Sequence, residues 1–196
     1  MAIRNSTKFA FANALKSLLN TKELSRIRIQ ELCRICGTER PTFYYHFRDK
    51  YDLIAWIYEQ DLQEALSSSD GHYHVDQMEN LLLRMQKEHV FYKKAFADST
   101  QNALLPYIRQ MNIRLAKAVQ LERQTPDALT PEEEFHINFF TYSWCYCLMD
   151  WINGTYDLTA AQYAQLMYRS MSYLDIPGIL AGKPPQGRAQ RSYSDS

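Results

Sequence analysis

Residues 27–53 read IRIQELCRICGTERPTFYYHFRDKYDL, and the order of these residues points to one local architecture. Ile29, Leu32 and Cys33 share one side of a short helix expected over residues 29–35. Gly37 stands at the C-cap position of that helix, and a second short helix is expected over residues 39–46. Two short helices joined by a glycine turn are typical of a helix-turn-helix, whose second helix enters the DNA major groove.

The second helix carries side chains that suit contact with DNA. Arg40 can donate a pair of hydrogen bonds to guanine, and Pro41 offers apolar surface to a thymine methyl group. Phe43 and Phe47 lie four residues apart and are expected to anchor the helix in the core. Donors to phosphate are expected from Thr42, Tyr44, Tyr45 and His46. The alternative interpretation of the Tyr-Tyr-His run is an aromatic packing cluster.

Lys50 is expected in the first turn of the next helix, where the helix dipole disfavours a cation. A phosphate bound jointly by Lys50 and the free N–H groups of that turn would resolve the conflict. Asp49 is expected to cap this helix, with Asp52 as its capping-box partner, and Thr38 to cap the helix before it.

The whole chain has 196 residues, of which 46% are apolar and 22% charged, with 6 Gly and 7 Pro. These proportions indicate a globular protein and argue against a turn-rich β fold. Neither a membrane span nor a secretory signal is apparent, so a cytoplasmic protein with reduced cysteines is expected. Net charge is zero, but residues 1–50 hold 10 basic against 4 acidic side chains, and residues 51–182 hold 9 against 17. A basic N-terminal quarter suggests a part that binds a polyanion, although chance clustering on solvated faces is the alternative.

Helical periodicity continues along the rest of the chain, and an all-α fold of about nine helices is predicted. The predicted ends of the last two helices are supported by capping residues. Thr130 and Glu133 mark the start of helix 131–153, Gly154 follows its end, and Thr159 marks the start of the last helix. Loops are expected at 67–72 and 124–131, and a disordered tail at 183–196. The predicted helices cover residues 5–19, 29–35, 39–46, 50–66, 75–88, 90–97, 102–121, 131–153 and 159–174.

Residues 37–53, GTERPTFYYHFRDKYDL, closely resemble the signature of the TetR family of bacterial transcriptional regulators, and the likeness extends over about residues 5–66. Segments 49–57, 91–96 and 151–154 are similar to one branch of that family, the regulators related to the dihydroxyacetone-kinase operon activator of Gram-positive bacteria. The resemblance implies a helix-turn-helix DNA-binding domain at 1–50 and a helical effector-binding and dimerisation domain at 51–182.

The resemblance also implies roles for single residues. Positions that touch bases or lie in the groove correspond to Gln30, Arg40, Pro41 and Tyr44, and positions that touch phosphate to Thr42, Tyr45, His46 and Lys50. Two positions depart from the family pattern. Arg28 stands where a capping Thr or Ser is common, which implies an ionic phosphate contact. Glu39 stands where Ser is common, and its carboxylate is repulsive toward DNA unless it pairs with Arg40 or accepts from cytosine.

The family's effector pocket and dimer interface are expected in the C-terminal part. Helix 131–153 is apolar nearly all round, so a second subunit is the expected cover for one of its faces. Pocket candidates are aromatic side chains with polar tips and a methionine, and core packing is the alternative for each: Trp56, Tyr92, Phe96, Tyr107, Met111, His136, Phe140, Tyr142 and Trp144. Dimer candidates are Phe139, Leu148, Ile152, Tyr163, Leu166, Met167 and Met171.

Neither a metal site nor catalysis is predicted. Cys33 and Cys36 have the spacing of metal ligands, but Cys145 and Cys147 lie at i and i+2 of a helix and point to different sides. No phosphate-binding glycine loop or nucleophile motif is present, and no cofactor is expected.

The sequence therefore predicts a homodimeric transcription regulator, by family default a repressor, that binds a near-palindromic double-stranded operator under the control of a small apolar ligand. Two alternatives remain open. One is an activator or co-activator controlled by a partner protein, and the other is a helical enzyme or ligand carrier that does not bind DNA.

Overall fold

A computed structural model describes residues 2–66, 75–97, 101–122 and 129–173. Within these residues the chain forms α-helices, one short 3₁₀ turn over Leu24–Arg26 and no strand, so the predicted all-α fold is confirmed. The helices are α1 (Ala2–Leu19), α2 (Ile29–Ile35), α3 (Arg40–His46), α4 (Lys50–Leu66), α5 (Val75–Lys87), α6 (His89–Ala97), α7 (Gln101–Glu122), α8 (Pro131–Ile152) and α9 (Ala160–Tyr173).

Several predicted helix ends agree with the structure because their caps are local. Gly37 and Gly154 adopt φ of +62° and +79°, the left-handed conformation that ends α2 and α8. The Thr130 hydroxyl accepts from the Glu133 N–H at 3.2 Å, and the Glu133 carboxylate accepts from the Thr130 N–H at 2.7 Å. Thr159 and Gln162 form the same reciprocal pair at the start of α9.

One predicted cap and one predicted capping-box partner differ from the structure. Glu39, not Thr38, is the N-cap of α3, and the Thr38 hydroxyl is buried with no hydrogen-bond partner among the described residues. Asp49 caps α4 as predicted, accepting from the N–H groups of Tyr51 at 2.8 Å and Asp52 at 2.9 Å. The carboxylate of Asp52, however, returns to the N–H of Arg48 at 2.9 Å, one residue before the predicted partner.

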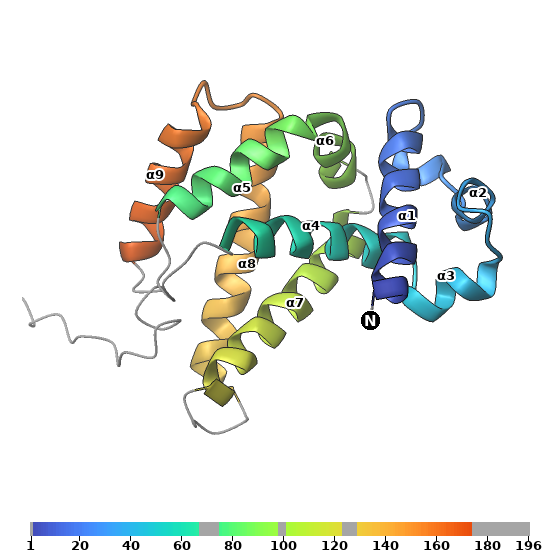
Figure 1. The fold of residues 1–196 in the computed structure, drawn as a ribbon. Helices are drawn as coiled ribbons and strands as arrows, with labels where there is room; N and C mark the ends of the chain where they lie inside the picture. The colour runs from blue at the N-terminus through green and yellow to red at the C-terminus, as the bar shows by residue number, and fades with distance from the viewer. Residues whose placement is uncertain (1, 67–74, 98–100, 123–128, 174–196) are drawn as a thin grey trace, which may run out of the picture.

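Helices α1–α3 gather at one end of the molecule, and α4 runs from them into the other helices (Figure 1). We refer to described residues 2–50 as the head, and to residues 51–66 of α4 together with α5–α9 as the body. Within the body, α4 packs on α7 and α5, α7 on α8, and α9 on α5. Helix α6 contacts α1 as well as α8, so α4 and α6 both join the body to the head.

Aromatic side chains form the centre of the head. The rings of Phe11 and Phe43 meet edge to face at 5.2 Å, and those of Phe43 and Phe47 lie 5.7 Å apart. All three side chains are buried, together with Leu15, Leu19 and Leu32. Burying rings on one side of α3 therefore holds this short helix against α1 and leaves its other side to the solvent.

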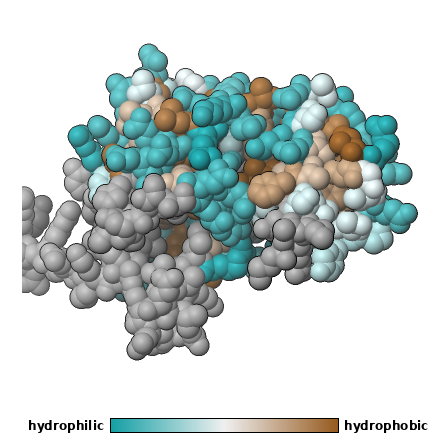
Figure 2. All heavy atoms as spheres, in the orientation of Figure 1, coloured by the Kyte–Doolittle hydropathy of each residue, from teal (hydrophilic) through white to brown (hydrophobic). Residues whose placement is uncertain are grey.

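Some predictions fall on other parts of the chain. The expected loop at 67–72, most of the loop at 124–131 and the expected tail at 183–196 lie outside the described residues. Across the residues that are described, no helix combines the length and the apolar character that a membrane crossing needs. The face of the molecule in Figure 2 is largely hydrophilic, with hydrophobic residues in small groups.

Candidate nucleic-acid interface and effector cleft

Helices α2 and α3 pack on each other across the Gly37 turn, which gives the predicted helix-turn-helix geometry. Helix α3 presents its unburied side outward. Tyr44 and Tyr45 are 47% and 67% exposed, whereas Phe43, next to them in sequence, is 0% exposed. The two tyrosines are therefore not part of the buried core, although the Tyr44 ring contacts that of Phe43 at 5.7 Å and the Tyr45 ring that of His46 at 5.0 Å.

The outer face of α3 brings together the candidates for base and phosphate contact. Arg40, Pro41, Tyr44 and Tyr45 are exposed, and Thr42 and His46 are half-buried beside them. The Arg40 guanidinium donates to the Tyr44 hydroxyl at 3.3 Å and lies 5.8 Å from the centre of its ring. That hydrogen bond raises the pKa of Arg40 and orients its planar donor group along the helix surface.

The start of α2 adds two exposed side chains to this region, Arg28 and Gln30. The backbone N–H of Arg28 donates to the Glu31 carboxylate at 3.1 Å, and the residue is exposed. Glu31 also accepts from Lys22, and that contact holds the pKa of Glu31 below its usual value. Glu39 is exposed at the N-cap of α3 and forms no ion pair with Arg40, whose described hydrogen bond goes to Tyr44.

Lys50 has a structural role that the sequence did not indicate. Its ammonium donates to the carbonyl of Leu24 at 2.6 Å and lies 3.4 Å and 3.5 Å from those of Ile27 and Ser25. The first N–H groups of α4 are meanwhile occupied by Asp49. The prediction that these N–H groups join Lys50 in binding a phosphate is therefore wrong, because a carboxylate of the chain already fills that place. A phosphate contact of Lys50 by itself stays a prediction.

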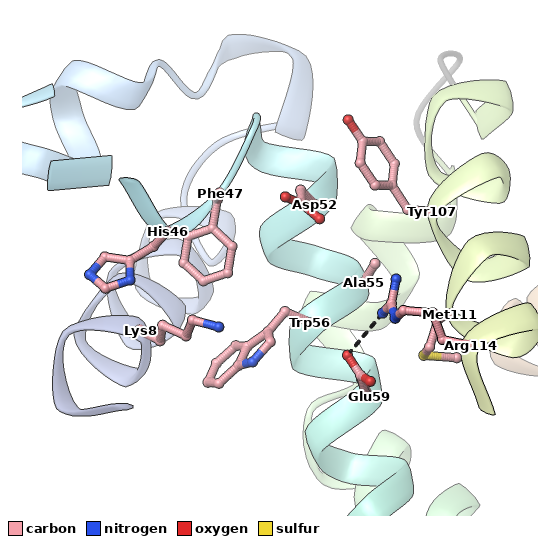
Figure 3. A pocket seen from close by; sticks show the side chains of 10 residues that line it. All are labelled: Lys8, His46, Phe47, Asp52, Ala55, Trp56, Glu59, Tyr107, Met111 and Arg114. Atoms are coloured by element: carbon pink, nitrogen blue, oxygen red, sulfur yellow. Dashed lines mark hydrogen bonds and ion pairs between the residues drawn. The ribbon is translucent and has the colours of Figure 1, made fainter. Parts of the chain in front are cut away.

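An open cleft of about 190 Å³ lies where the head meets the body (Figure 3). Its floor is one face of α4, formed by Asp52, Ala55, Trp56 and Glu59. One wall comes from the head, with Lys8, His46 and Phe47, and the opposite wall from α7, with Tyr107, Met111 and Arg114. Three predicted pocket residues, Trp56, Tyr107 and Met111, thus line one cleft.

The other predicted pocket residues are placed elsewhere. Tyr92, Phe96 and Trp144 are 0%, 3% and 3% exposed and belong to the body's own core, so they are corrected to packing residues. Phe140 stacks on Trp144 at 6.2 Å as part of the same packing. His136 is half-buried beside Phe135, and Tyr142 is 45% exposed on α8, so neither lines the cleft.

Two of the buried aromatics, Trp144 and Tyr92, have hydrogen-bond partners for their polar groups inside the body. The Trp144 ring N–H donates to the Tyr58 hydroxyl at 2.8 Å, and the Tyr92 hydroxyl donates to the Asp61 carboxylate. Burial raises the pKa of Asp61 and raises that of Tyr92 well above its ordinary value. The polar groups of Trp144 and Tyr92 are thus satisfied without a ligand, whereas the buried Tyr163 hydroxyl has no partner among the described residues.

Two sets of contacts tie the head to the body. The Tyr107 hydroxyl donates to Asp49 at 2.6 Å, and the Arg48 guanidinium donates to Gln110 at 3.1 Å while lying 4.5 Å from the centre of the Tyr107 ring. Burial and the Asp49 hydrogen bond raise the pKa of Tyr107 to about 12. In the second set of contacts, the Lys94 ammonium of α6 donates to the Lys22 carbonyl of the head at 3.1 Å.

The predicted dimer residues divide into two groups. Leu148, Ile152, Tyr163 and Met167 are at most 9% exposed, because they pack inside the chain's own core, so they are corrected to core residues. Phe139 and Leu166 are 46% and 51% exposed, and the side chain of Met171 lies outside the described residues. Sequence reasoning missed Phe135 and Tyr146 as members of the exposed α8 face: with Phe139 and Tyr142 they recur at helical spacing and are 45–63% exposed.

The cysteines are all free thiols. Burial raises the pKa of Cys145 to about 12 and raises that of Cys36. Searching the described part of the chain yields no group of three or more His, Cys, Asp or Glu side chains that could hold a metal ion.

Comparison with known proteins agrees with this architecture. The chain is similar to the HTH-type dhaKLM operon transcriptional activator DhaS of Lactococcus lactis subsp. lactis (strain IL1403), with 29% identity over 91 residues, which are 46% of this chain and 49% of that protein. The match therefore spans about half the length of the curated relative.

One solved structure extends the similarity of fold to most of the chain. The dihydroxyacetone kinase operon activator DhaS matches 86% of this chain and 95% of its own, with a TM-score of 0.52 and 17% identity, so the two share a fold. NalD, the secondary repressor of the MexAB-OprM multidrug efflux pump in Pseudomonas aeruginosa, matches 86% of this chain and 96% of its own, with a TM-score of 0.47 and 19% identity.

A family model for TetR-type proteins, described as a transcriptional regulator C-terminal region, matches residues 75–173, half of the chain. This match covers α5–α9 of the body, whereas the helix-turn-helix lies in the head. The chain belongs to the TetR family of transcriptional regulators.

Proposed function

We propose that this TetR-family protein is a cytoplasmic homodimer whose two heads bind successive major-groove faces of a near-palindromic operator. We place the boundary of the DNA-binding domain at residue 50 and assign residues 51–182 to effector binding and dimerisation. The single observation that carries the proposal is the outer face of α3, where Arg40, Tyr44 and Tyr45 are exposed while Phe43 anchors the helix from behind.

Each exposed group has a place in the proposed complex. Arg40 donates its fork of N–H groups to guanine, and Pro41 contacts a thymine methyl group. Hydroxyl, ring N–H and cationic groups around them bind phosphate, which sets the register of the head on the duplex. These phosphate partners are Arg28, Thr42, Tyr45 and His46, with Gln30 and Tyr44 at the edge of the groove. The excess of 10 basic over 4 acidic side chains in residues 1–50 attracts the head to DNA.

The exposed face of α8 is the proposed dimer surface. Phe135, Phe139, Tyr142 and Tyr146 expose 45–63% of their surface in the single chain, and such an apolar face is unfavourable in water. A symmetric contact between two copies buries the face and brings two heads to half-sites about 34–36 Å apart or a longer helically phased distance.

Changing Phe139 to Glu tests this surface. Phe139→Glu should convert the dimer to a monomer in sedimentation experiments and weaken operator binding by about 100-fold or more, because each head then binds alone. Leu83→Glu is the matched control, since Leu83 is 41% exposed on α5. A variant Phe139→Glu that remains dimeric would refute the α8 surface.

The main test is selection of bound sequences from a random duplex pool at two salt concentrations. A palindromic consensus with steep salt dependence is expected. Arg40→Ala should lose about 1–3 kcal/mol of binding free energy and relax the preference at one base pair. Arg169→Ala on α9 serves as the control for loss of a surface arginine. If no sequence is enriched, or if Arg40→Ala leaves the enriched sequences unchanged, α3 is not the DNA-recognition helix. Either outcome would favour a helical enzyme or carrier.

The sign of regulation has two candidates. Repression is what the family resemblance implies by default. Activation under the control of a partner protein is the second candidate, favoured by the described activator relative and by the filled core around Tyr92 and Trp144. Transcription from a promoter that carries the selected consensus, measured with and without the protein, distinguishes the two.

A further inference from the structure

One charged side chain that lines the cleft between head and body has no ion-pair partner among the described residues. Asp52 is paired with the Arg48 guanidinium at 3.6 Å, and Glu59 with that of Arg114 at 3.4 Å. Lys8 is the exception among the charged groups that line the cleft: no carboxylate of the described residues lies within ion-pair distance of its ammonium. The lining as a whole has no net charge, with Lys8 and Arg114 against Asp52 and Glu59, but the ammonium of Lys8 is the charge that no described carboxylate pairs.

Lys8 is placed against flat apolar surface. Its ammonium lies 5.4 Å from the centre of the Trp56 ring and 5.6 Å from that of Phe47, and its side chain points toward the indole from the head side of the cleft (Figure 3). The Phe9 ring meets Trp56 edge to face at 5.1 Å. A cation beside an indole and phenyl rings offers a charge for an anion and a stacking surface for a planar body.

The size of the cleft restricts what can enter. A cavity of roughly 150 Å³ holds one benzene molecule, and the cleft has about 190 Å³. Ala55 keeps the floor low between the two walls, so a single ring can lie over α4 between Trp56 and Met111.

We propose that this cleft binds a small single-ring aromatic carboxylate, with the carboxylate on Lys8 and the ring over Trp56. The inference rests on the proposed function and names its effector class. Such a ligand touches Lys8 and Phe47 of the head and Tyr107 and Met111 of α7 together. It therefore alters DNA binding to the extent that its affinity differs between two arrangements of head and body.

Direct binding without DNA tests the site. Benzoate is the anionic probe and benzamide its neutral counterpart of the same shape, each titrated into the full chain by calorimetry. Benzoate should bind at least about tenfold more tightly than benzamide, since a hydrogen bond to a charged group is worth about 1.5–3 kcal/mol. Equal affinities, or no heat of binding for benzoate up to millimolar concentration, would overturn the proposal.

Variants assign the effect to Lys8. Lys8→Gln should weaken benzoate binding about tenfold or more and leave benzamide unchanged, whereas Lys8→Arg should retain benzoate binding. Lys87→Gln on α5 is the matched control, and thermal unfolding checks that each variant is folded. Unchanged benzoate binding in Lys8→Gln would overturn the assignment.

Operator binding separates this inference from the proposed function. If the duplex selection succeeds but benzoate does not bind, the cleft inference fails alone. If Lys8→Gln weakens binding to all duplexes equally and benzoate does not bind, Lys8 is a phosphate contact and the inference is wrong. If benzoate binds through Lys8 but no duplex is selected, the site stands and the DNA-binding proposal fails.

Discussion

Tyrosines of the head and the body have opposite environments. Tyr44 and Tyr45 of α3 are 47% and 67% exposed, whereas Tyr92 of α6 and Tyr163 of α9 are 0% and 1% exposed. Helix α3 has only seven residues and is anchored by Phe43, so its other residues face outward. Helix α6 lies between α1 and α8, so Tyr92 is enclosed.

The comparison teaches that residue type alone does not separate a binding surface from a core. An exposed aromatic face on a short, well-anchored helix costs little stability and is available to a partner. Of the two buried tyrosines, Tyr92 satisfies its hydroxyl inside the protein by donating to Asp61, whereas the Tyr163 hydroxyl has no partner among the described residues. Burial and partners, rather than composition, therefore distinguish the candidate DNA interface from the body.

The largest expected effect is the difference in the free energy of unfolding between two variants of α3, Phe43→Ala and Tyr45→Ala. Phe43→Ala should lower the free energy of unfolding by about 3–5 kcal/mol, because it leaves a cavity between α3 and α1. Tyr45→Ala should change it by less than about 0.5 kcal/mol and weaken operator binding instead. Urea unfolding followed by circular dichroism measures both. Similar losses of stability in the two variants would remove the distinction between anchor and surface.

Lys50 tests whether the head's surface and scaffold are separate. Lys50→Ala leaves the carbonyls of Leu24 and Ile27 without their ammonium partner, and the free energy of unfolding should fall by about 1–3 kcal/mol. If Lys50 also binds phosphate, the slope of log affinity against log salt should decrease by about 1. Lys93→Ala on the exposed side of α6 is the control. A variant Lys50→Ala as stable as the parent would exclude the scaffold role.

The smallest effect concerns Asp61, a half-buried carboxylate of the body. Burial raises the pKa of Asp61 in the folded chain, against the lowering effects of Tyr92, Lys16 and Arg84. Its contribution to stability is therefore fully present below the ordinary value of 3.8 and is lost as pH rises through the raised pKa. Asp61→Asn should gain stability relative to the parent as pH increases from below that value to neutrality.

Chemical unfolding of the parent and Asp61→Asn at several pH values measures this difference, since the other carboxylates titrate in both proteins. A difference that is constant with pH would show that Asp61 has the same pKa in the folded and unfolded chains. A difference of opposite sign would show that its cationic neighbours outweigh burial.

Much of the fold was predictable because helix periodicity and caps depend on residues a few positions apart. The ranges of α2 and α4 agree with the prediction, and the ends at Gly37 and Gly154 follow from their left-handed backbone. The exposure of Arg40 and Tyr44 was also predictable, since Phe43 and Phe47 define the buried side of the same helix.

Other assignments depended on contacts that the local pattern does not contain. Trp56 and Tyr107 line a cleft while Trp144 fills the core, although all three matched the same description of an aromatic with a polar tip. Leu148 and Tyr163 were predicted at the dimer interface because a single chain offered no visible cover for them. Packing of α8 and α9 within the body supplies that cover.

The sequence by itself determined the all-α fold, the helix-turn-helix and the outward side of α3, because these follow from interactions within about four residues along a helix. Only the tertiary structure decided the partners of Lys50 at Leu24, of Tyr107 at Asp49 and of Trp144 at Tyr58. Those pairs are separated by 26, 58 and 86 positions. Their contacts arise when whole helices pack to bury apolar surface, and no local pattern records which faces then meet.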